Sequence, residues 1–298
     1  MSIPESQLEI WSHQGAVTTA KKTHESIRKA LDSHIWLPGV SKPEVYLQGS
    51  YKNTTNIRGD SDVDVVAQLN STFQPDLSEL TDHQKILHKQ AHPDATYLWK
   101  HFRADVLTAL RNYFGDSAVS IGNKSLKVVG NSNRLPADVV ACLQYKKYKY
   151  FNSVNDQDYI EGMVFYTLRE NRKVINFPKV HYQNGTEKNG RTASRYKPTI
   201  RVFKNARTYL VKQGIISKDL APSYFLECLL YNVPDVNFTF NYQNTFCSVV
   251  SWLQKANMTN FLCQHEQFPL FGNTPEQWSS SDSQYFLQML VNLWNNWN

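Results

Sequence analysis

Two aspartates set two residues apart are the side chains of this sequence best suited to chemistry. Asp62 and Asp64 lie in the string DSDVDVV, beside a β-branched run. Residues i and i+2 of a strand share a face, so both carboxylates should point to one spot while Val63 and Val65 enter a core. Two like charges this close are costly unless a cation lies between them. Hard oxygen ligands of this kind suit Mg²⁺ or Mn²⁺.

A Gly-Ser turn precedes the aspartates. Eleven residues separate Gly49-Ser50 from Asp62. Glycine lets phosphate oxygens reach backbone N–H groups and the serine hydroxyl without a side chain in the way. A phosphate cradle followed by a metal-holding pair predicts nucleotidyl transfer. The alternative is a surface hairpin with a solvated acidic turn, which we take to describe Asp60, next to a glycine.

The string GSYKNTTNIRGDSDVDVV resembles the signature of the polymerase-β-like nucleotidyltransferases. It is closer still to the cGAS/DncV-like nucleotidyltransferases of bacterial CBASS anti-phage systems, which join nucleotides into cyclic signalling molecules. The resemblance implies a third carboxylate on a later strand between hydrophobic residues. Asp138, in RLPADVV, fits that place as a metal ligand and base. From the pattern alone Asp138 is also consistent with an ordinary strand-edge aspartate.

Composition excludes several classes of protein. The chain has 298 residues, 41% hydrophobic and 13% aromatic, which suits a soluble globular protein of one large domain or two lobes. No apolar run reaches eighteen residues and the N-terminus is polar and acidic, so we expect neither a membrane span nor a signal peptide. The four cysteines are scattered, which favours buried thiols in a reducing cytosol over disulfides or a zinc site. The family resemblance implies that this compartment is a bacterial cytoplasm.

The formal net charge of +6 suits polyanionic partners, either nucleic acid or nucleoside triphosphates. The basic residues are spread along the chain, so charge alone does not decide between them. The sequence contains no Cys/His insertion like the zinc thumb of the DNA-sensing animal relatives. By this resemblance a nucleic-acid activator is not expected.

Apolar periodicity predicts a small mixed sheet packed on helices, with the three carboxylates converging at one edge. Helical spacing is found over 5–38, 78–90, 95–114 and 196–214. Strands are predicted at 45–48, 57–70, 118–121, 125–129, 137–143 and 160–165. The YKKYKYF run at 145–151 is interpreted as a strand with one wet face, although such runs can also contact nucleic acid.

Three further stretches are interpreted without assigning them chemistry. Residues 174–189 are polar and contain Asn-Gly, which predicts a loop. The chain from residue 237 onward is predicted to be helical and aromatic. Four histidines match no metal-ligand spacing and are expected on the solvated surface: His83, His88, His92 and His101.

By resemblance the fold is α/β (α+β), a polymerase-β-like palm with a mixed sheet and a helical second lobe. The N-terminal helix and palm are expected over residues 1–170. A mostly helical lobe over 171–298 is expected to complete a central nucleotide cleft.

Four residues of the second half acquire roles from the resemblance. The stretch around Asn176, which precedes Phe-Pro, resembles the connection between the lobes in the clade E branch of this family, where such an asparagine faces the nucleobase. Its amide donates and accepts, and so can match the O4/N3 edge of uracil; the alternative is an asparagine capping a turn. Lys204 and Ser223 match a clamp for the β- and γ-phosphates, and Tyr224 a residue that stacks on the donor base. A solvated basic helix face and ordinary packing are the alternatives.

The resulting prediction is an enzyme with two Mg²⁺ ions, or Mn²⁺ in their place, that joins two nucleoside triphosphates (UTP, ATP or GTP). The expected product is a cyclic dinucleotide such as cyclic di-UMP or cyclic UMP-AMP, which acts on a downstream effector; the enzyme itself is expected to be a monomer. A purine cyclic dinucleotide or trinucleotide synthase, a linear polymerase and a non-catalytic nucleotide-binding module stay open. An antibiotic-modifying transferase needs an acidic acceptor pocket, which the basic second half disfavours.

Overall fold

The structure is a computed structural model that describes residues 1–58 and 62–297. Asp60, interpreted above as a solvated turn residue, lies outside the described residues.

The chain forms two compact units. The sheet unit comprises Val17–Gly49 and Ser61–Lys179; the helical unit comprises Met1–Ala16, Ser50–Asp60 and Val180–Asn298. The sequence predicted a single division after residue 170. In the structure the division lies nine residues later, and two earlier segments belong with the helical unit. One unit boundary falls between Gly49 and Ser50.

The sheet unit is built on a mixed sheet, as predicted. Its described strands follow the order β1-β2-β5-β4-β3, and β6 and β7 extend it from β5. Strands β2 and β5 are parallel, whereas the other pairs are antiparallel. The strands are β1 (Glu44–Leu47), β2 (Val63–Asp76), β3 (Val119–Ile121), β4 (Leu126–Val128), β5 (Ala137–Ser153), β6 (Asp156–Tyr166) and β7 (Lys173–Asn176).

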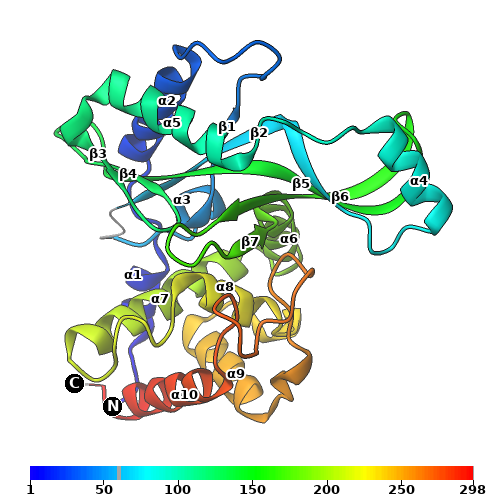
Figure 1. The fold of residues 1–298 in the computed structure, drawn as a ribbon. Coiled ribbons are helices and arrows are strands. Elements are labelled where there is room, and N and C mark those ends of the chain that lie inside the picture. The colour runs from blue at the N-terminus through cyan, green and yellow to red at the C-terminus, as the bar shows by residue number, and fades with distance from the viewer. Residues whose placement is uncertain (59–61, 298) are drawn as a thin grey trace. The chain divides into compact units, whose positions relative to one another are not determined.

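Helices cover this sheet in two places. Figure 1 shows α2 (Thr18–Asp32) and α5 (Trp99–Phe114) side by side over one face, and α4 (Asp82–Ala91) beside the long β5–β6 hairpin. Helix α4 begins at a capping box, in which the Thr81 side chain and the Gln84 side chain bond each other's backbone N–H.

The core of the sheet alternates with the strand period. Val63 and Val65 are fully buried on one face. On the other face, Val66 packs with Val140 and Cys142 in an apolar cluster. This alternation, which is read directly from the sequence, puts Asp64 on the face opposite to Val63 and Val65.

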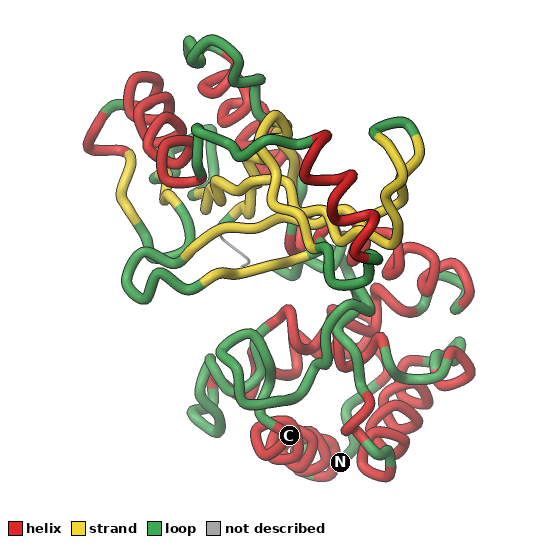
Figure 2. The backbone as a smooth tube through the Cα atoms, turned by 45° about the vertical axis from the view of Figure 1, so that its right-hand side comes forward, coloured by secondary structure: helices red, strands yellow, loops and turns green. Residues whose placement is uncertain are grey.

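Helices predominate in the helical unit (Figure 2). Helices α3 and α6 begin in the sheet unit and continue in the helical one. The helices are α1 (Glu5–Ser12), α3 (Gly49–Asn53), α6 (Pro178–Arg191), α7 (Tyr196–Lys212), α8 (Ser223–Tyr231), α9 (Tyr242–Lys255) and α10 (Ser280–Asn295), and short 3₁₀ turns are η1 (Asp116–Ala118) in the sheet unit, η2 (Asp235–Asn237) and η3 (Met258–Asn260). Fully buried residues of α1, α7, α8, α9 and α10 share one apolar core.

The loop predicted over residues 174–189 is wrong. The stretch contains the end of β7 and most of α6, which starts at Pro178, a residue favoured in the first helical turn. Its Asn-Gly pair, Asn184 and Gly185, packs against Gln264. The Asn184 amide donates to the Gln264 main-chain carbonyl at 2.8 Å. A Cβ added at Gly185 would overlap the Gln264 side chain. The loop prediction failed because a glycine required for close packing cannot be distinguished, in the sequence, from a glycine required for a turn.

The structure also tests the predictions for the C-terminal segment and for residues 145–151. The segment between α9 and α10 is largely non-helical, although the sequence predicted helix throughout. The interpretation of residues 145–151 as a strand is confirmed, since they lie within β5.

His88 is buried, which contradicts the predicted solvated position. The residue is 4% exposed, and its ring makes edge contacts with Phe73, Tyr148 and Phe151. Its Nε2 atom has no hydrogen-bond partner among the described residues. Burial, together with the charges of His92 and Lys146, lowers the pKa of His88 to about 4. His83 and His101 are exposed, as predicted.

His88 should make the protein sensitive to mild acid. The unfolded chain binds the proton at the ordinary histidine pKa of about 6.5, whereas the folded chain resists it until about 4. The contribution to stability is therefore complete above pH 6.5 and is lost as the pH falls toward 4. We expect His88→Phe to reduce the drop in melting temperature between pH 7 and pH 5. His83→Phe, on the same helix, is the control, and an equal change in both variants would contradict the assignment.

Candidate active site

Asp64 and Asp138 stand directly opposite each other in the parallel pair β2–β5. Adjacent strands lie about 4.8 Å apart, and residues in register share a face. The pairing begins one residue earlier, where the Val63 N–H donates to the Pro136 carbonyl at 2.9 Å. Asp62 is exposed and lies immediately before β2, two residues from Asp64. The structure thus brings Asp64 and Asp138 together and places Asp62 two residues before Asp64 in the chain.

The carboxylates of Asp64 and Asp138 are half-buried because they lie at the edge of an apolar patch on their face of the sheet. Two residues further on, Val66 and Val140 are buried in the apolar cluster of the sheet. Asp64 and Asp138 occupy the first part of each strand, before that cluster begins. The Asp138 side chain retains 27% of its exposure. The carboxylates are held by packed strands and are still open to a ligand.

Two residues of the β4 hairpin complete the surroundings of Asp138. The Ser125 hydroxyl donates to Oδ1 of Asp138 at 3.0 Å. Lys127 pairs with Asp138 across the antiparallel strands, and its Nζ lies 3.9 Å from the same oxygen. Sequence reasoning did not identify either residue. The signal was available, since the predicted strand at 125–129 places Ser125 and Lys127 on one face.

Gly49 lies against the carboxylate of Asp64. Its backbone is left-handed, with φ of +64°, and a Cβ there would overlap Oδ2 of Asp64. The neighbouring Gln48 N–H donates to the Asp64 carbonyl at 3.0 Å. Only glycine combines this φ with so close an approach at low cost. The predicted Gly-Ser turn is the first turn of the short helix α3, and Ser50 is half-buried there.

The donor set of this edge suits a hard divalent cation. Among the residues that the structure describes, no three His, Cys, Asp or Glu side chains are grouped closely enough to hold a metal ion. The in-register pair Asp64 and Asp138 nevertheless provides carboxylate oxygens alone, which is the chemistry of Mg²⁺ and Mn²⁺ ligands. Asp62 is the carboxylate that would complete a three-ligand set. All three aspartates have the ligand type that the predicted ions need, and two of them, Asp64 and Asp138, also stand opposite each other in the sheet.

Asn176 ends β7 in the same sheet. Its Oδ1 accepts the Phe177 N–H at 2.8 Å. This bond directs the amide oxygen to the main chain and leaves the NH₂ group as the part of the side chain able to donate to a ligand.

The three residues predicted to form the phosphate clamp and the base stack of the second lobe lie in the helical unit. Lys204 is fully buried, and its Nζ donates to the Thr55 carbonyl at 2.9 Å. Ser223 starts α8, and its hydroxyl accepts from Arg207 at 3.2 Å. Tyr224 stacks on His181, with ring centroids 5.5 Å apart. Contacts of these side chains to phosphate or base stay predictions.

Comparison with known proteins now identifies the family. The C-terminal helical domain of the cGAS/DncV-like nucleotidyltransferases matches residues 183–295. Over 297 residues the chain is 57% identical to the cyclic UMP-AMP synthase of Rhodothermus marinus, covering all of this chain and 99% of that protein. The chain belongs to the cGAS/DncV-like nucleotidyltransferases. A solved structure of a Rhodothermus marinus CdnE c-UMP-AMP synthase with Apcpp and Upnpp is 56% identical and superposes with a TM-score of 0.91 over 99% of this chain and 98% of that one.

Two other relatives support membership in the CdnE branch of the cGAS/DncV-like nucleotidyltransferases. CdnE01 of Staphylococcus haemolyticus, a cyclic nucleotide synthase, is 42% identical over the full length of both chains. The CdnE cyclic dinucleotide synthase of Elizabethkingia meningoseptica, solved with GTP and Apcpp, is 33% identical over 97% of this chain and 98% of its own, with a TM-score of 0.78. The predicted fold class, the family and nucleotidyltransferase activity are thereby confirmed.

This cGAS/DncV-like nucleotidyltransferase contains, in its described part, no helix with the length and apolar character needed to cross a bilayer.

Proposed function

We propose that this enzyme condenses two nucleoside triphosphates into a uridine-containing cyclic dinucleotide, with cyclic UMP-AMP as the first candidate. The observation that carries the proposal is the 57% identity, over the whole chain, to a cyclic UMP-AMP synthase. Relatives such as the cyclic dipurine nucleotide synthase of Elizabethkingia, 34% identical, make other products. The choice of bases must therefore depend on particular residues of this chain.

In this proposal a ribose hydroxyl attacks the α-phosphate of the other nucleotide and pyrophosphate leaves. A ribose hydroxyl of the linear intermediate then attacks the α-phosphate of its remaining triphosphate, a second pyrophosphate leaves, and the ring closes. Asp62, Asp64 and Asp138 would hold two Mg²⁺ ions, which supply positive charge for the phosphate oxygens when bound. Gly49 and Ser50 offer a backbone approach and a hydroxyl to the phosphate. Ser125 and Lys127 hold the Asp138 carboxylate in place through the contacts described above.

The enzyme is further proposed to act in bacterial anti-phage signalling through its product alone. UTP, ATP and GTP are the candidate substrates, and a protein that binds the cyclic dinucleotide is the expected effector. The bound nucleotide analogues in the solved relatives support triphosphate substrates for this chain.

One incubation tests the reaction and the product together. The enzyme is given all four labelled nucleoside triphosphates with Mg²⁺, the mixture is treated with phosphatase, and the survivors are identified by mass spectrometry. We expect a phosphatase-resistant product containing uridine and adenosine. A ladder of phosphatase-sensitive products would indicate a linear polymerase, and a resistant purine-only product would contradict the base assignment. Absence of Mg²⁺-dependent pyrophosphate release would contradict catalysis.

Asn176 is expected to determine the uridine preference. With its oxygen bound to the Phe177 N–H, its NH₂ can donate to O4 of uracil. A site built around such a hydrogen bond discriminates strongly between ligands with and without the partner atom. We expect Asn176→Ala to lower the ratio of uridine to purine in the product by about 10- to 100-fold. Competition between UTP and ATP measures this ratio, and an unchanged ratio would remove Asn176 from base selection.

A further inference from the structure

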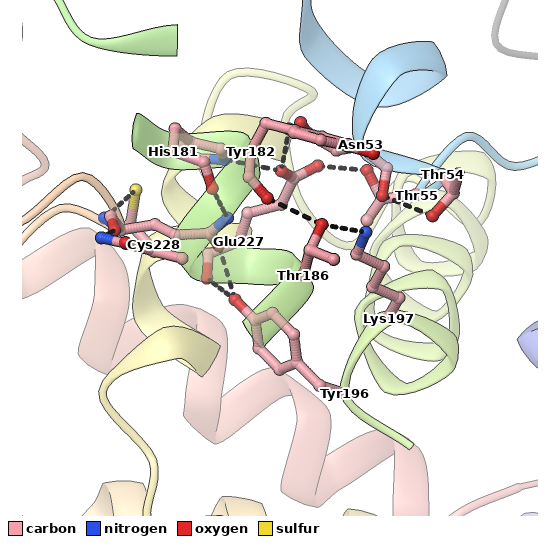
Figure 3. Close-up of polar contacts among 12 residues, drawn as sticks. Asn53, Thr54, Thr55, His181, Tyr182, Thr186, Tyr196, Lys197, Glu227 and Cys228 are labelled. Atoms are coloured by element: carbon pink, nitrogen blue, oxygen red, sulfur yellow. Dashed lines mark hydrogen bonds and ion pairs between the residues drawn. The ribbon is translucent and has the colours of Figure 1, made fainter. Parts of the chain in front are cut away.

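Glu227 is a buried carboxylate to which the end of α3 is bound. The residue lies in the apolar helix α8 and is 3% exposed. Its Oε2 accepts from the Asn53 amide at 2.9 Å, and its Oε1 accepts from the Thr55 hydroxyl at 2.5 Å. Figure 3 shows these two bonds converging on the Glu227 side chain. All of these residues belong to the helical unit.

The charge of Glu227 is compensated within the same unit. His181 of α6 lies 3.0 Å from Oε2 and is itself buried. Burial alone would raise the pKa of Glu227, but the bond and charge of His181, the charge of Lys204 and the Thr55 hydroxyl lower it. The carboxylate is therefore charged at neutral pH. A buried charge without such partners is strongly destabilising, so the site depends on all of them.

The main chain beyond α3 is held from a second direction. Lys204 donates to the Thr55 carbonyl at 2.9 Å, and Arg201 donates to the Thr54 carbonyl at 2.5 Å. Side-chain and backbone groups of residues 53–55 are thus bound to α7 and α8. Helix α3 has five residues, too few to be stable alone. Tertiary contacts must therefore hold it in place, and the bonds to residues 53–55 are among them.

We propose that Glu227 is a positioning residue for nucleotidyl transfer, and that it acts through Ser50. This inference rests on the proposed function. The carboxylate binds Asn53 and Thr55, and these residues determine where the first turn of α3, with Ser50, lies on the helical unit. Glu227 does not touch substrate. Its effect on the reaction passes through the Ser50 hydroxyl.

A purely structural ion pair is the competing explanation, and the chain offers a matched control for it. In the same unit, Lys188 is buried and binds Asp235 at 2.7 Å, and Arg191 binds the other oxygen of Asp235. Among the described residues, Asp235 accepts hydrogen bonds from the side chains of Lys188 and Arg191, and neither of these residues belongs to α3. Asp235→Asn therefore removes a partly buried charge pair without removing a contact of α3.

The test is a double-mutant cycle between Glu227→Gln and Ser50→Ala. Glutamine keeps the shape but presents an NH₂ group to donors that need an acceptor. We expect Glu227→Gln to lower kcat/KM for UTP and ATP by about tenfold or more, because a misplaced catalytic group is costly. In the Ser50→Ala background Glu227→Gln should have little further effect, since the two changes act as a unit. Asp235→Asn should lower the melting temperature and leave kcat/KM unchanged.

Two outcomes overturn the proposal. One is a Glu227→Gln enzyme that loses stability but keeps kcat/KM; the other is a double variant in which the two losses multiply in full. If Glu227→Gln does not fold, Thr55→Val, which removes one hydroxyl, takes its place in the double-mutant cycle with Ser50→Ala. The loss of kcat/KM caused by Thr55→Val should then be small in the Ser50→Ala background. A wild-type enzyme that releases no pyrophosphate would instead contradict the proposed function, so the two failures are distinguishable.

Discussion

Replacing Asp64 with asparagine is expected to reduce nucleotidyl transfer by about 1,000-fold or more, because several kcal/mol of charge stabilisation at the reacting phosphate would be lost. Asp64 stands in register with Asp138 on the parallel strand. Asparagine keeps the shape of the side chain and removes one of two adjacent like charges. We therefore expect a melting temperature equal to or above that of the wild type. Turnover is measured as pyrophosphate release with saturating UTP and ATP.

A second measurement addresses the metal without using activity. A cation that binds only the folded enzyme raises its melting temperature. Mg²⁺ should therefore stabilise the wild type and should stabilise Asp64→Asn and Asp138→Asn much less. Asp158→Asn is the control, since this aspartate of β6 is paired with Lys149 at 3.0 Å on the same sheet. Cyclic products from the double variant Asp62→Asn/Asp64→Asn would falsify the catalytic assignment.

Replacing Gly49 with alanine is expected to lower kcat/KM by about 100-fold, as a small misplacement at a reacting centre does. Two effects act together. An L-residue at φ of +64° costs about 1 kcal/mol, and the new Cβ would overlap the Asp64 carboxylate. That carboxylate must then rotate or shift away from its place opposite Asp138.

Gly39→Ala separates the two effects. Gly39 lies in the same unit with φ of +85°, and a Cβ there meets nothing within 4 Å. Both variants should lose a similar amount of stability from backbone strain, measured as melting temperature. Only Gly49→Ala should lose activity. Equal kinetic losses in the two variants would show that the contact with Asp64 does not matter.

The sequence predicts the chemistry of the candidate site better than its surroundings. Alternation around Val63 and Val65 is enough to place Asp62 and Asp64 toward one side, because burial of one strand face leaves no choice. The pattern alone did not distinguish Asp138 from an ordinary strand-edge residue; a family resemblance was needed. The register that sets Asp138 opposite Asp64 is a long-range pairing, and local patterns contain no information on such pairs.

The errors have physical causes of the same kind. The pair Asn184-Gly185 indicated a turn, but the glycine is there to admit the Gln264 side chain. His88 lies in a largely polar stretch, and the rings of the distant Phe73, Tyr148 and Phe151 pack against it. Both outcomes depend on residues far along the chain.

Glu227 was also missed, although the sequence contains a signal for it. In SYFLECLLY an acidic residue stands among apolar ones at the core of a helix. A carboxylate in that setting needs buried partners. The sequence could have predicted that partners exist, but Asn53 and Thr55 lie more than 170 residues away.

The break in register of β2 lies beyond the carboxylates. From Val63 to Leu69 the strand pairs with β5 residue by residue, and the shift occurs between Leu69 and Phe73. A one-residue insertion in β2 between Asp64 and Leu69 would move Asp64 to the opposite face of the sheet from Asp138 of β5. An insertion after Leu69 falls where the ladder already accommodates extra backbone. The part of β2 after Leu69 can therefore tolerate changes in length. The part from Val63 to Leu69, which carries Asp64, must keep a constant number of residues.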